Sequence, residues 1–234
     1  MLLTRPLSNR SLLPLLCLLG GLAPAALAQV CAIPGAAGPA TASGVVNTYY
    51  EGVDGSVAAG STSIPIGPMN VLTGDTTPVA VGDLVLIIQM QDADIDTSNT
   101  DSYGDGVAGG VAAGAQALNS TGRHEYCVAQ AAVAAGSLAV RCGGAGGGLQ
   151  YTYRQQPAVL NSALRRSYQV IRVPQYSSAT VTGTVIASRW NGRTGGVLAM
   201  DVAGNLAING TISGAGRGFR GGGAIPGGAN YPSV

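Results

Sequence analysis

The chain has 234 residues and is close to electrical neutrality, with 12 basic residues, 11 acidic residues and one histidine. This balance argues against a nucleic-acid-binding protein, which needs a clustered basic surface. Glycine occurs 37 times, whereas tryptophan and phenylalanine occur once each. The apolar residues are mainly Ala, Val, Leu and Ile, which favour thin β layers over a thick aromatic core, and we expect an all-β fold.

Residues 1–28 have the pattern of a secretory signal peptide. Arg5 and Arg10 form a charged start, Leu12–Leu22 is an apolar run, and Ala26-Leu27-Ala28 is a cleavage motif of small residues. The apolar run is short for a membrane span. The sequence therefore predicts cleavage near Ala28, a mature chain without a transmembrane segment, and a bacterial protein that is secreted or displayed at the cell surface.

The mature chain up to residue 179 is predicted to be rich in β structure. Residues 29–43 are small and rich in proline and glycine, which is typical of a linker or an N-terminal cap. A β-rich module follows over residues 44–179. Its clearest strand is Val81–Met90, where a continuous apolar run predicts burial on both faces. Ser167–Val173 alternates polar and apolar residues, which predicts a half-buried strand.

Three cysteines remain after the signal peptide, and an exported protein favours a disulfide between two of them. The segment from His124 to Cys142 has the pattern of a β-hairpin that turns near Ala134–Ser137. Folding it there places Cys127 opposite Cys142, which is the favoured pair. Cys31 is then a free thiol or a link to another chain. The alternative is three reduced thiols.

Residues 180–223 have a different, repeated sequence pattern. Short β-branched runs (Thr180–Ile186, Gly196–Val202, Leu206–Ile212) alternate with glycine and asparagine turns. The backbone hydrogen-bonding groups of strands this short need partners on neighbouring strands. The repeated pattern therefore predicts successive rungs of a β-solenoid. The glycine-rich tail, residues 224–234, either covers the open edge of the last rung or marks the chain as the N-terminal segment of a larger surface protein, which we favour.

Three stretches carry a resemblance to a known group of proteins. VGDLVLIIQMQDADID (residues 81–96), YQVIRVPQYSSATV (168–181) and WNGRTGGVLAMDVAGNLAINGTISGAGRGFRGG (190–222) resemble the N-terminal region of large secreted bacterial surface proteins. These include adventurous-gliding-motility-type proteins and proteins of unknown function with extracellular repeats. The resemblance implies a right-handed β-helix-like fold with an inserted small β-barrel or hairpin module, displayed on or released from the cell envelope. It implies no catalytic residue.

An acidic cluster is the candidate metal site. It consists of Asp92, Asp94, Asp96, Asn99 and Asp101. Alternating aspartates on an extended segment place like charges on one side, and calcium would neutralise them with hard oxygen ligands. The spacing does not match an EF-hand loop, because Thr97 stands where glycine is required. The alternative, which we favour, is a solvated acidic loop.

The aromatic residues Trp190 and Tyr176 are a candidate glycan-binding pair, because exposed aromatic faces pack on sugar rings. The alternative, which we favour, is that Trp190 anchors the core at a solenoid corner. The single histidine, His124, stands beside Glu125 without an identifiable nucleophile, and we expect no catalytic set there.

These observations predict a non-enzymatic structural or adhesive module at the cell surface. Loops such as Gln91–Ala117 would contact an extracellular glycan or protein partner, and no cofactor other than calcium is expected. The alternative function is a secreted carbohydrate-binding accessory module. A polysaccharide lyase or hydrolase is disfavoured, because the rungs after Thr180 offer only Asp201 as an acid.

Overall fold

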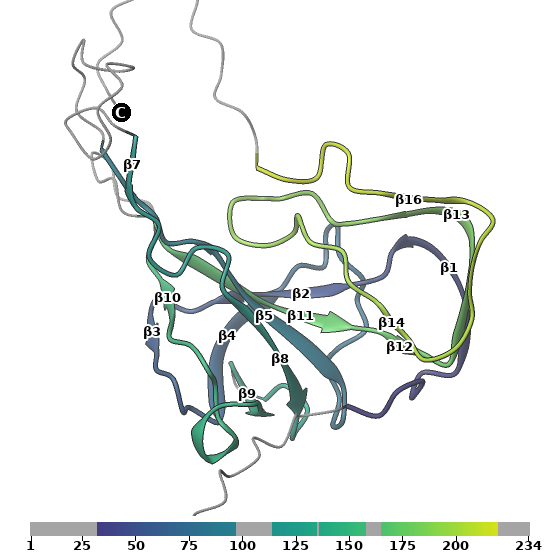
Figure 1. Cartoon of the computed structure of the whole chain (residues 1–234), viewed down its shortest axis with the longest axis horizontal. Helices are drawn as coiled ribbons and strands as arrows, with labels where there is room; N and C mark the ends of the chain where they lie inside the picture. The colour runs from purple at the N-terminus through teal and green to yellow at the C-terminus, as the bar shows by residue number, and fades with distance from the viewer. Residues whose placement is uncertain (1–31, 97–113, 135, 158–164, 220–234) are drawn as a thin grey trace, which may run out of the picture.

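The computed structural model describes residues 32–96, 114–134, 136–157 and 165–219. It confirms an all-β fold, in which a barrel and a small set of parallel strands lie beside each other (Figure 1). The signal segment 1–28, Cys31 and the tail 224–234 lie outside the described residues.

Six strands close into the barrel, in the order β11-β2-β4-β9-β8-β5. They are β2 (Thr48–Gly52), β4 (Ser63–Met69), β5 (Leu84–Gln91), β8 (His124–Ala129), β9 (Ser137–Arg141) and β11 (Ser167–Val173). Each neighbouring pair is antiparallel. One apolar cluster that includes the fully buried Ile64, Ile87, Leu138 and Val170 fills the interior. The small barrel that the resemblance implies is therefore present.

The strands β2, β5 and β11 form the wall between the barrel and the parallel strands. Val85, Leu86 and Ile87 are buried in succession along β5, as the continuous apolar run predicts. For β11 the prediction of a half-buried strand is wrong, because six of its seven residues are buried. Val170 faces the barrel core, whereas Ile171 belongs to a second apolar cluster on the other side of the wall. A sequence pattern cannot reveal a second apolar layer that another part of the chain supplies.

The predicted cysteine hairpin is present in the barrel. The strands β8 and β9 are antiparallel, with Val128 opposite Arg141, and they turn at a bridge between Ala134 and Ser137. A disulfide joins Cys127 to Cys142, with the two Cα atoms 4.4 Å apart. This is the pair that the hairpin register favours.

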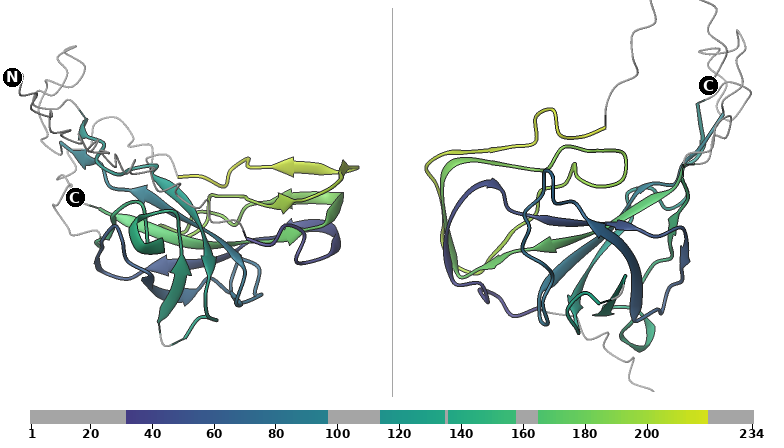
Figure 2. Two further views of the ribbon diagram at one scale, coloured as in Figure 1. Left: turned by 60° about the horizontal axis from the view of Figure 1, so that its bottom comes forward. Right: turned by 180° about the vertical axis from the view of Figure 1, so that it is seen from behind.

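The parallel strands form three layers, which we call the parallel stack. Layer one is β1 (Pro39–Val45), layer two is β12 (Gln175–Tyr176) with β13 (Ser178–Ile186), and layer three is β14 (Asp201–Val202), β15 (Leu206–Ile208) and β16 (Thr211–Ser213). The strand β1 pairs in parallel with β13, β13 with β15 and β16, and β12 with β14. Figure 2 shows the three layers one above another. The whole barrel is inserted in the sequence between layers one and two.

The second and third layers repeat at a nearly constant spacing along the chain. In the first part of layer two, Gln175 pairs with Asp201. Further along, Thr180 pairs with Ala207 and Ile186 pairs with Ser213. In both of these wider pairs, the two residues are one position further apart in the sequence than Gln175 and Asp201 are. Beyond the strands, the amide of Trp190 donates to the carbonyl of Arg217 over 2.9 Å, at the same separation as the two wider pairs.

We call the separation of these wider pairs the layer spacing. It stays the same from Thr180 to Trp190 on layer two, and from Ala207 to Arg217 on layer three. The chain therefore follows the same path twice between residues 175 and 217.

The parallel stack differs from the predicted strands in three places. Within the predicted linker or cap, 29–43, residues from Pro39 onward belong to β1. Within Gly196–Val202, only Asp201 and Val202 form a strand, and Leu206–Ile212 divides into β15 and β16. The reason is that short strands exist only where a neighbour pairs with them. The neighbour of β1 lies far away in the sequence.

The remaining elements are short. They are β3 (Gly55–Val57) paired with β10 (Tyr153–Gln155), β6 (Asp94–Ile95) paired with β7 (Ala115–Ala117), and the 3-10 turn η1 (Ala145–Gly147). The ribbon of β6 and β7 projects away from the barrel (Figure 1). Among the described residues, no helix has the length and apolar character needed to cross a membrane.

Candidate functional site

The predicted acidic site begins at the end of β5, and an arginine holds its first two aspartates. The Asp92 side chain is fully buried and forms an ion pair with Arg166, which lies just before β11. The same guanidinium reaches the Asp94 carboxylate over 3.0 Å. The backbone amide of Ser120 donates to Asp92 over 3.0 Å, and Arg154 lies 3.6 Å away.

The barrel topology brings these charges together. Because β5 and β11 are antiparallel neighbours with Gln91 opposite Ser167, the residue after β5 meets the residue before β11. A hydrogen bond from Asn119 and the nearby Arg166 guanidinium hold the pKa of Asp94 below its usual value. The hydrogen bond to Asp92 raises the pKa of Arg166. Asp94 and Arg166 are therefore both charged at neutral pH.

This geometry bears on the calcium prediction. The neutralisation that calcium was expected to supply at Asp92 and Asp94 is supplied by Arg166. Asp96 directly follows β6, whereas Asn99 and Asp101 lie outside the described residues. A calcium site of all five residues stays a prediction.

A second polar centre lies inside the barrel, at Glu125. Its carboxylate is buried and accepts hydrogen bonds from the amide of Gln150 at 2.9 Å, the amide of Tyr151 at 3.2 Å and the Tyr153 hydroxyl at 3.1 Å. Burial, and then the charge of Glu125, raise the pKa of Tyr153 above its usual value. Glu125 therefore joins β8 to the segment that leads into β10.

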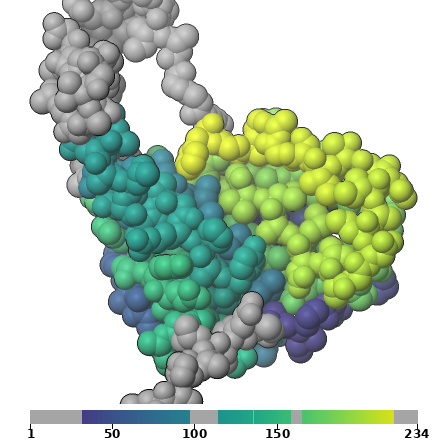
Figure 3. All heavy atoms as spheres, in the orientation of Figure 1, coloured from purple at the N-terminus to yellow at the C-terminus, as the bar shows by residue number. Residues whose placement is uncertain are grey.

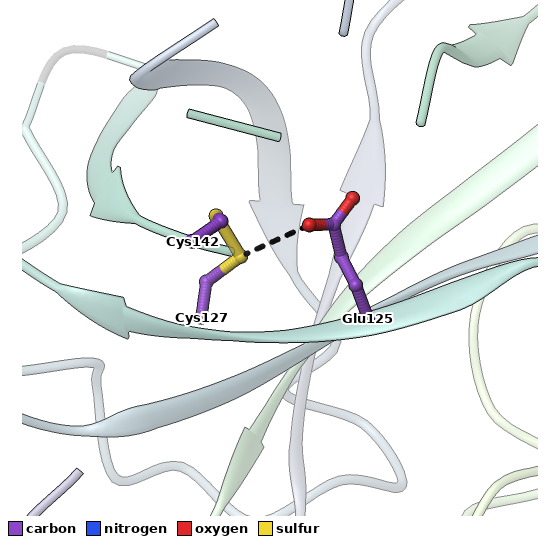
Figure 4. Close-up of side chains that lie close together, drawn as sticks. All are labelled: Glu125, Cys127 and Cys142. Atoms are coloured by element: carbon purple, nitrogen blue, oxygen red, sulfur yellow. Dashed lines mark hydrogen bonds between the residues drawn. A yellow bond between two sulfur atoms is a disulfide. The ribbon is translucent and has the colours of Figure 1, made fainter. Parts of the chain in front are cut away.

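The disulfide lies beside this carboxylate (Figure 4). The Glu125 carboxylate is 3.9 Å from Cys127 Sγ, which carries no proton while it is bonded to Cys142. Among the described residues, Glu125, Cys127 and Cys142 are the one group of three potential metal ligands within 4.8 Å of one another. Because metals bind thiolates, the oxidised pair is unsuited to hold a metal ion.

The sequence analysis considered Glu125 only as the neighbour of His124 and set both aside for lack of a nucleophile. The alternation of β8 separates the two side chains, since His124 is exposed and Glu125 is buried. The ring nitrogen Nδ1 of His124 lies 3.0 Å from the carbonyl oxygen of Gly122. The signal for Glu125 was its position two residues before Cys127, because residues two apart in a strand share a face.

The candidate glycan pair lacks the exposure that a sugar platform needs, and Trp190 is buried as the favoured core-anchor interpretation predicts. The Trp190 side chain is buried, 7% exposed, and packs edge-on against Phe219 with ring centroids 5.1 Å apart. Tyr176 is half-buried in β12. A sugar ring needs an exposed aromatic face, which the indole of Trp190 does not offer.

Phe219, which is 55% exposed, borders a cavity of about 260 Å³. The cavity is lined by Met90, Gln91, Ala93, Ile95, Thr121, Arg165 and Phe219.

A set of polar side chains joins the barrel wall to the segment between layers two and three. The amide of Gln169 both donates to and accepts from the backbone of Gly195 over 2.9 Å. The side-chain amide of Asn47 likewise donates to the carbonyl of Ala199 and accepts from its backbone amide. The Tyr49 hydroxyl donates to the carbonyl of Val197 over 2.6 Å. Burial raises the pKa of Tyr49 to about 12. These bonds, with the apolar cluster around Ile171, fix the parallel stack on the barrel.

In comparisons with known proteins, no family model, curated protein or solved structure matches this chain.

Proposed function

We propose that this protein is an exported, non-enzymatic structural or adhesive module of a bacterial surface. In this proposal a disulfide-linked barrel is inserted into the first turns of a β-solenoid. The observation that carries the proposal is the nearly constant spacing at which layer two pairs with layer three, from Gln175 to Ile186. A constant spacing of parallel strands is the property that defines a solenoid rung.

Glycines at the corners support the same interpretation. A side chain on Gly210 would place its Cβ atom 2.1 Å from the carbonyl oxygen of Gly183, and one on Gly204 would lie 2.7 Å from that of Ser177. Each contact joins residues that are separated by the layer spacing, so the backbones of successive layers approach too closely for a Cβ atom.

This close approach makes a testable prediction. Replacing Gly210 by alanine should separate layer two from layer three and raise the hydrogen-exchange rates of the β13 and β16 amides about tenfold, with the barrel amides unchanged. The matched control is Gly214→Ala, because a Cβ atom at Gly214 meets no atom within 4 Å. Equal exchange rates in the two variants would contradict the stacking of layers.

The export part of the proposal is supported by the signal-peptide pattern of residues 1–28 and by the buried disulfide. Disulfides persist in oxidising compartments and are rare in the cytosol. A structural role is supported by the hydrogen bonds and ion pairs that the buried polar groups described above form within the protein. Contact with a glycan or protein partner would fall to projecting segments such as the β6–β7 ribbon.

The direct test is to express the full gene in a bacterium and to sequence the N-terminus of the exported product. We expect a chain that begins at Gln29 and contains the Cys127–Cys142 disulfide. The control is the variant Arg5→Glu, Arg10→Glu, whose altered start should retain the precursor in the cytoplasm. An uncleaved cytoplasmic product with reduced cysteines would contradict the proposal.

A further inference from the structure

The chain contains two Asn-Gly pairs, and both lie in turns of the parallel stack. Asn191-Gly192 lies in the segment that leaves layer two, and Asn209-Gly210 joins β15 to β16 in layer three. Figure 3 shows layer three, in yellow and yellow-green, at the outer surface of the parallel stack. Asparagine before glycine is prone to deamidation, because glycine has no side chain to hinder the attack of its nitrogen on the asparagine amide. Both asparagines are exposed, so their hydrogen bonds decide how they differ.

The side chain of Asn191 is fixed by its own turn. Its Oδ1 atom accepts from the backbone amides of Arg193 over 2.9 Å and Thr194 over 2.8 Å, and its Nδ2 atom donates to the Thr194 hydroxyl over 3.2 Å. Arg165 donates to the carbonyl of Gly192. Closing a ring between Cγ of Asn191 and the Gly192 nitrogen moves the side chain out of this arrangement. The lost hydrogen bonds therefore raise the barrier to deamidation.

Asn209, in contrast, is held only through its backbone. Its amide donates to the carbonyl of Val181 over 2.9 Å, whereas its side chain makes no hydrogen bond within the part of the chain that the structure describes. The glycine that follows is required by the stacking, since a Cβ atom at Gly210 would lie 2.1 Å from the carbonyl oxygen of Gly183. The close approach of layers two and three thus places an unhindered glycine nitrogen beside an unrestrained asparagine side chain.

We propose that Asn209 is a site of spontaneous deamidation and that its product loosens layer three from layer two. The Gly210 nitrogen forms a bond to Cγ of Asn209 and loses its proton, the Cγ–Nδ2 bond breaks, and ammonia leaves. Water then opens the succinimide ring to an aspartate or an isoaspartate at position 209. Isoaspartate adds a carbon atom to the backbone at a corner that has no room for a Cβ atom. The inference goes beyond the proposed function, because it assigns a chemical modification that weakens the parallel stack with age.

The first test compares the two Asn-Gly pairs in one protein. The mature chain is incubated in mildly alkaline buffer, with and without urea, and digested with trypsin, which cuts after Arg189 and Arg193 and so separates the pairs. Deamidation adds about 1 Da to a peptide, and fragmentation distinguishes Asn209 from Asn205. In the folded protein we expect Asn209 to deamidate at least about tenfold faster than Asn191, which corresponds to a difference of about 1.4 kcal/mol between the two barriers. In urea the two rates should be similar.

The second test measures the consequence for the parallel stack. After incubation, the β15 and β16 amides should exchange about tenfold faster in the wild type than in Asn209→Ser, which has no side-chain amide to lose, while the barrel amides exchange equally in both. Equal rates at the two asparagines of the folded protein, or an Asn209 that is modified only in urea, would overturn the site. Modification without faster exchange would overturn the loosening. Fast exchange of β13 before incubation would overturn the proposed solenoid and this inference with it.

Discussion

Replacing Arg166 by methionine is expected to destabilise the protein by about 3 kcal/mol, because it leaves the buried Asp92 carboxylate without its main partner. Asp92 is 0% exposed, and the remaining cation, Arg154, lies 3.6 Å away on a partly exposed side chain. Breaking one partner of a buried pair costs more than the pair contributes, since the remaining charge must be desolvated alone. Chemical denaturation followed by circular dichroism measures the change.

The matched control is Arg189→Met, which removes the same charge at an exposed position. We expect it to change the free energy of unfolding by less than about 0.5 kcal/mol. The double variant Asp92→Asn, Arg166→Met should recover part of the loss, because it removes the unpaired charge. Equal destabilisation by the two arginine variants would show that Arg166 does not balance Asp92. A rise in Tm on adding calcium to the wild type would favour the calcium site instead.

Removing the disulfide is expected to have an effect of similar size. Cys127 and Cys142 are separated by 15 residues, and a cross-link over a loop of that length stabilises by about 3 kcal/mol. Both cysteines are buried in the barrel core. The double variant Cys127→Ala, Cys142→Ala should therefore unfold at lower denaturant concentration, and reductant should bring the wild type close to it.

The control for this experiment is Cys31→Ala, which should have wild-type stability and the same sensitivity to reductant. If reductant leaves the wild-type midpoint unchanged, or if the alanine pair has no effect, the disulfide does not stabilise the barrel. Loss of reductant sensitivity in Cys31→Ala would place the bond elsewhere.

The elements that sequence reasoning predicted are those whose signals are local. The apolar run of β5 and the hairpin between Cys127 and Cys142 need only neighbouring residues to be recognised. The strand β1 was missed, because its small residues Pro39–Val45 become a strand only through β13, which follows the whole barrel in the sequence. The burial of β11 on both faces was missed for the same reason.

The candidate sites also divide into features with a local sequence signal and features that depend on distant parts of the chain. The aspartates after β5 were found by their spacing, but the partner of Asp92 could not be, because Arg166 reaches it through the barrel closure between β5 and β11. The burial of the single tryptophan, Trp190, was expected from the sequence, whereas its contact with Phe219 is known only from the structure. The position of Glu125 two residues before Cys127 was an available signal that went unused.

The claim on which the rest depends is that β13 pairs in parallel with β15 and β16 at the layer spacing. Nuclear Overhauser effects between backbone protons of the labelled mature protein test it most directly. We predict contacts between Thr180 and Ala207 and between Val185 and Ile212, in the pattern of parallel strands. An antiparallel pattern, or no contact between these strands while the barrel contacts are present, would contradict the solenoid.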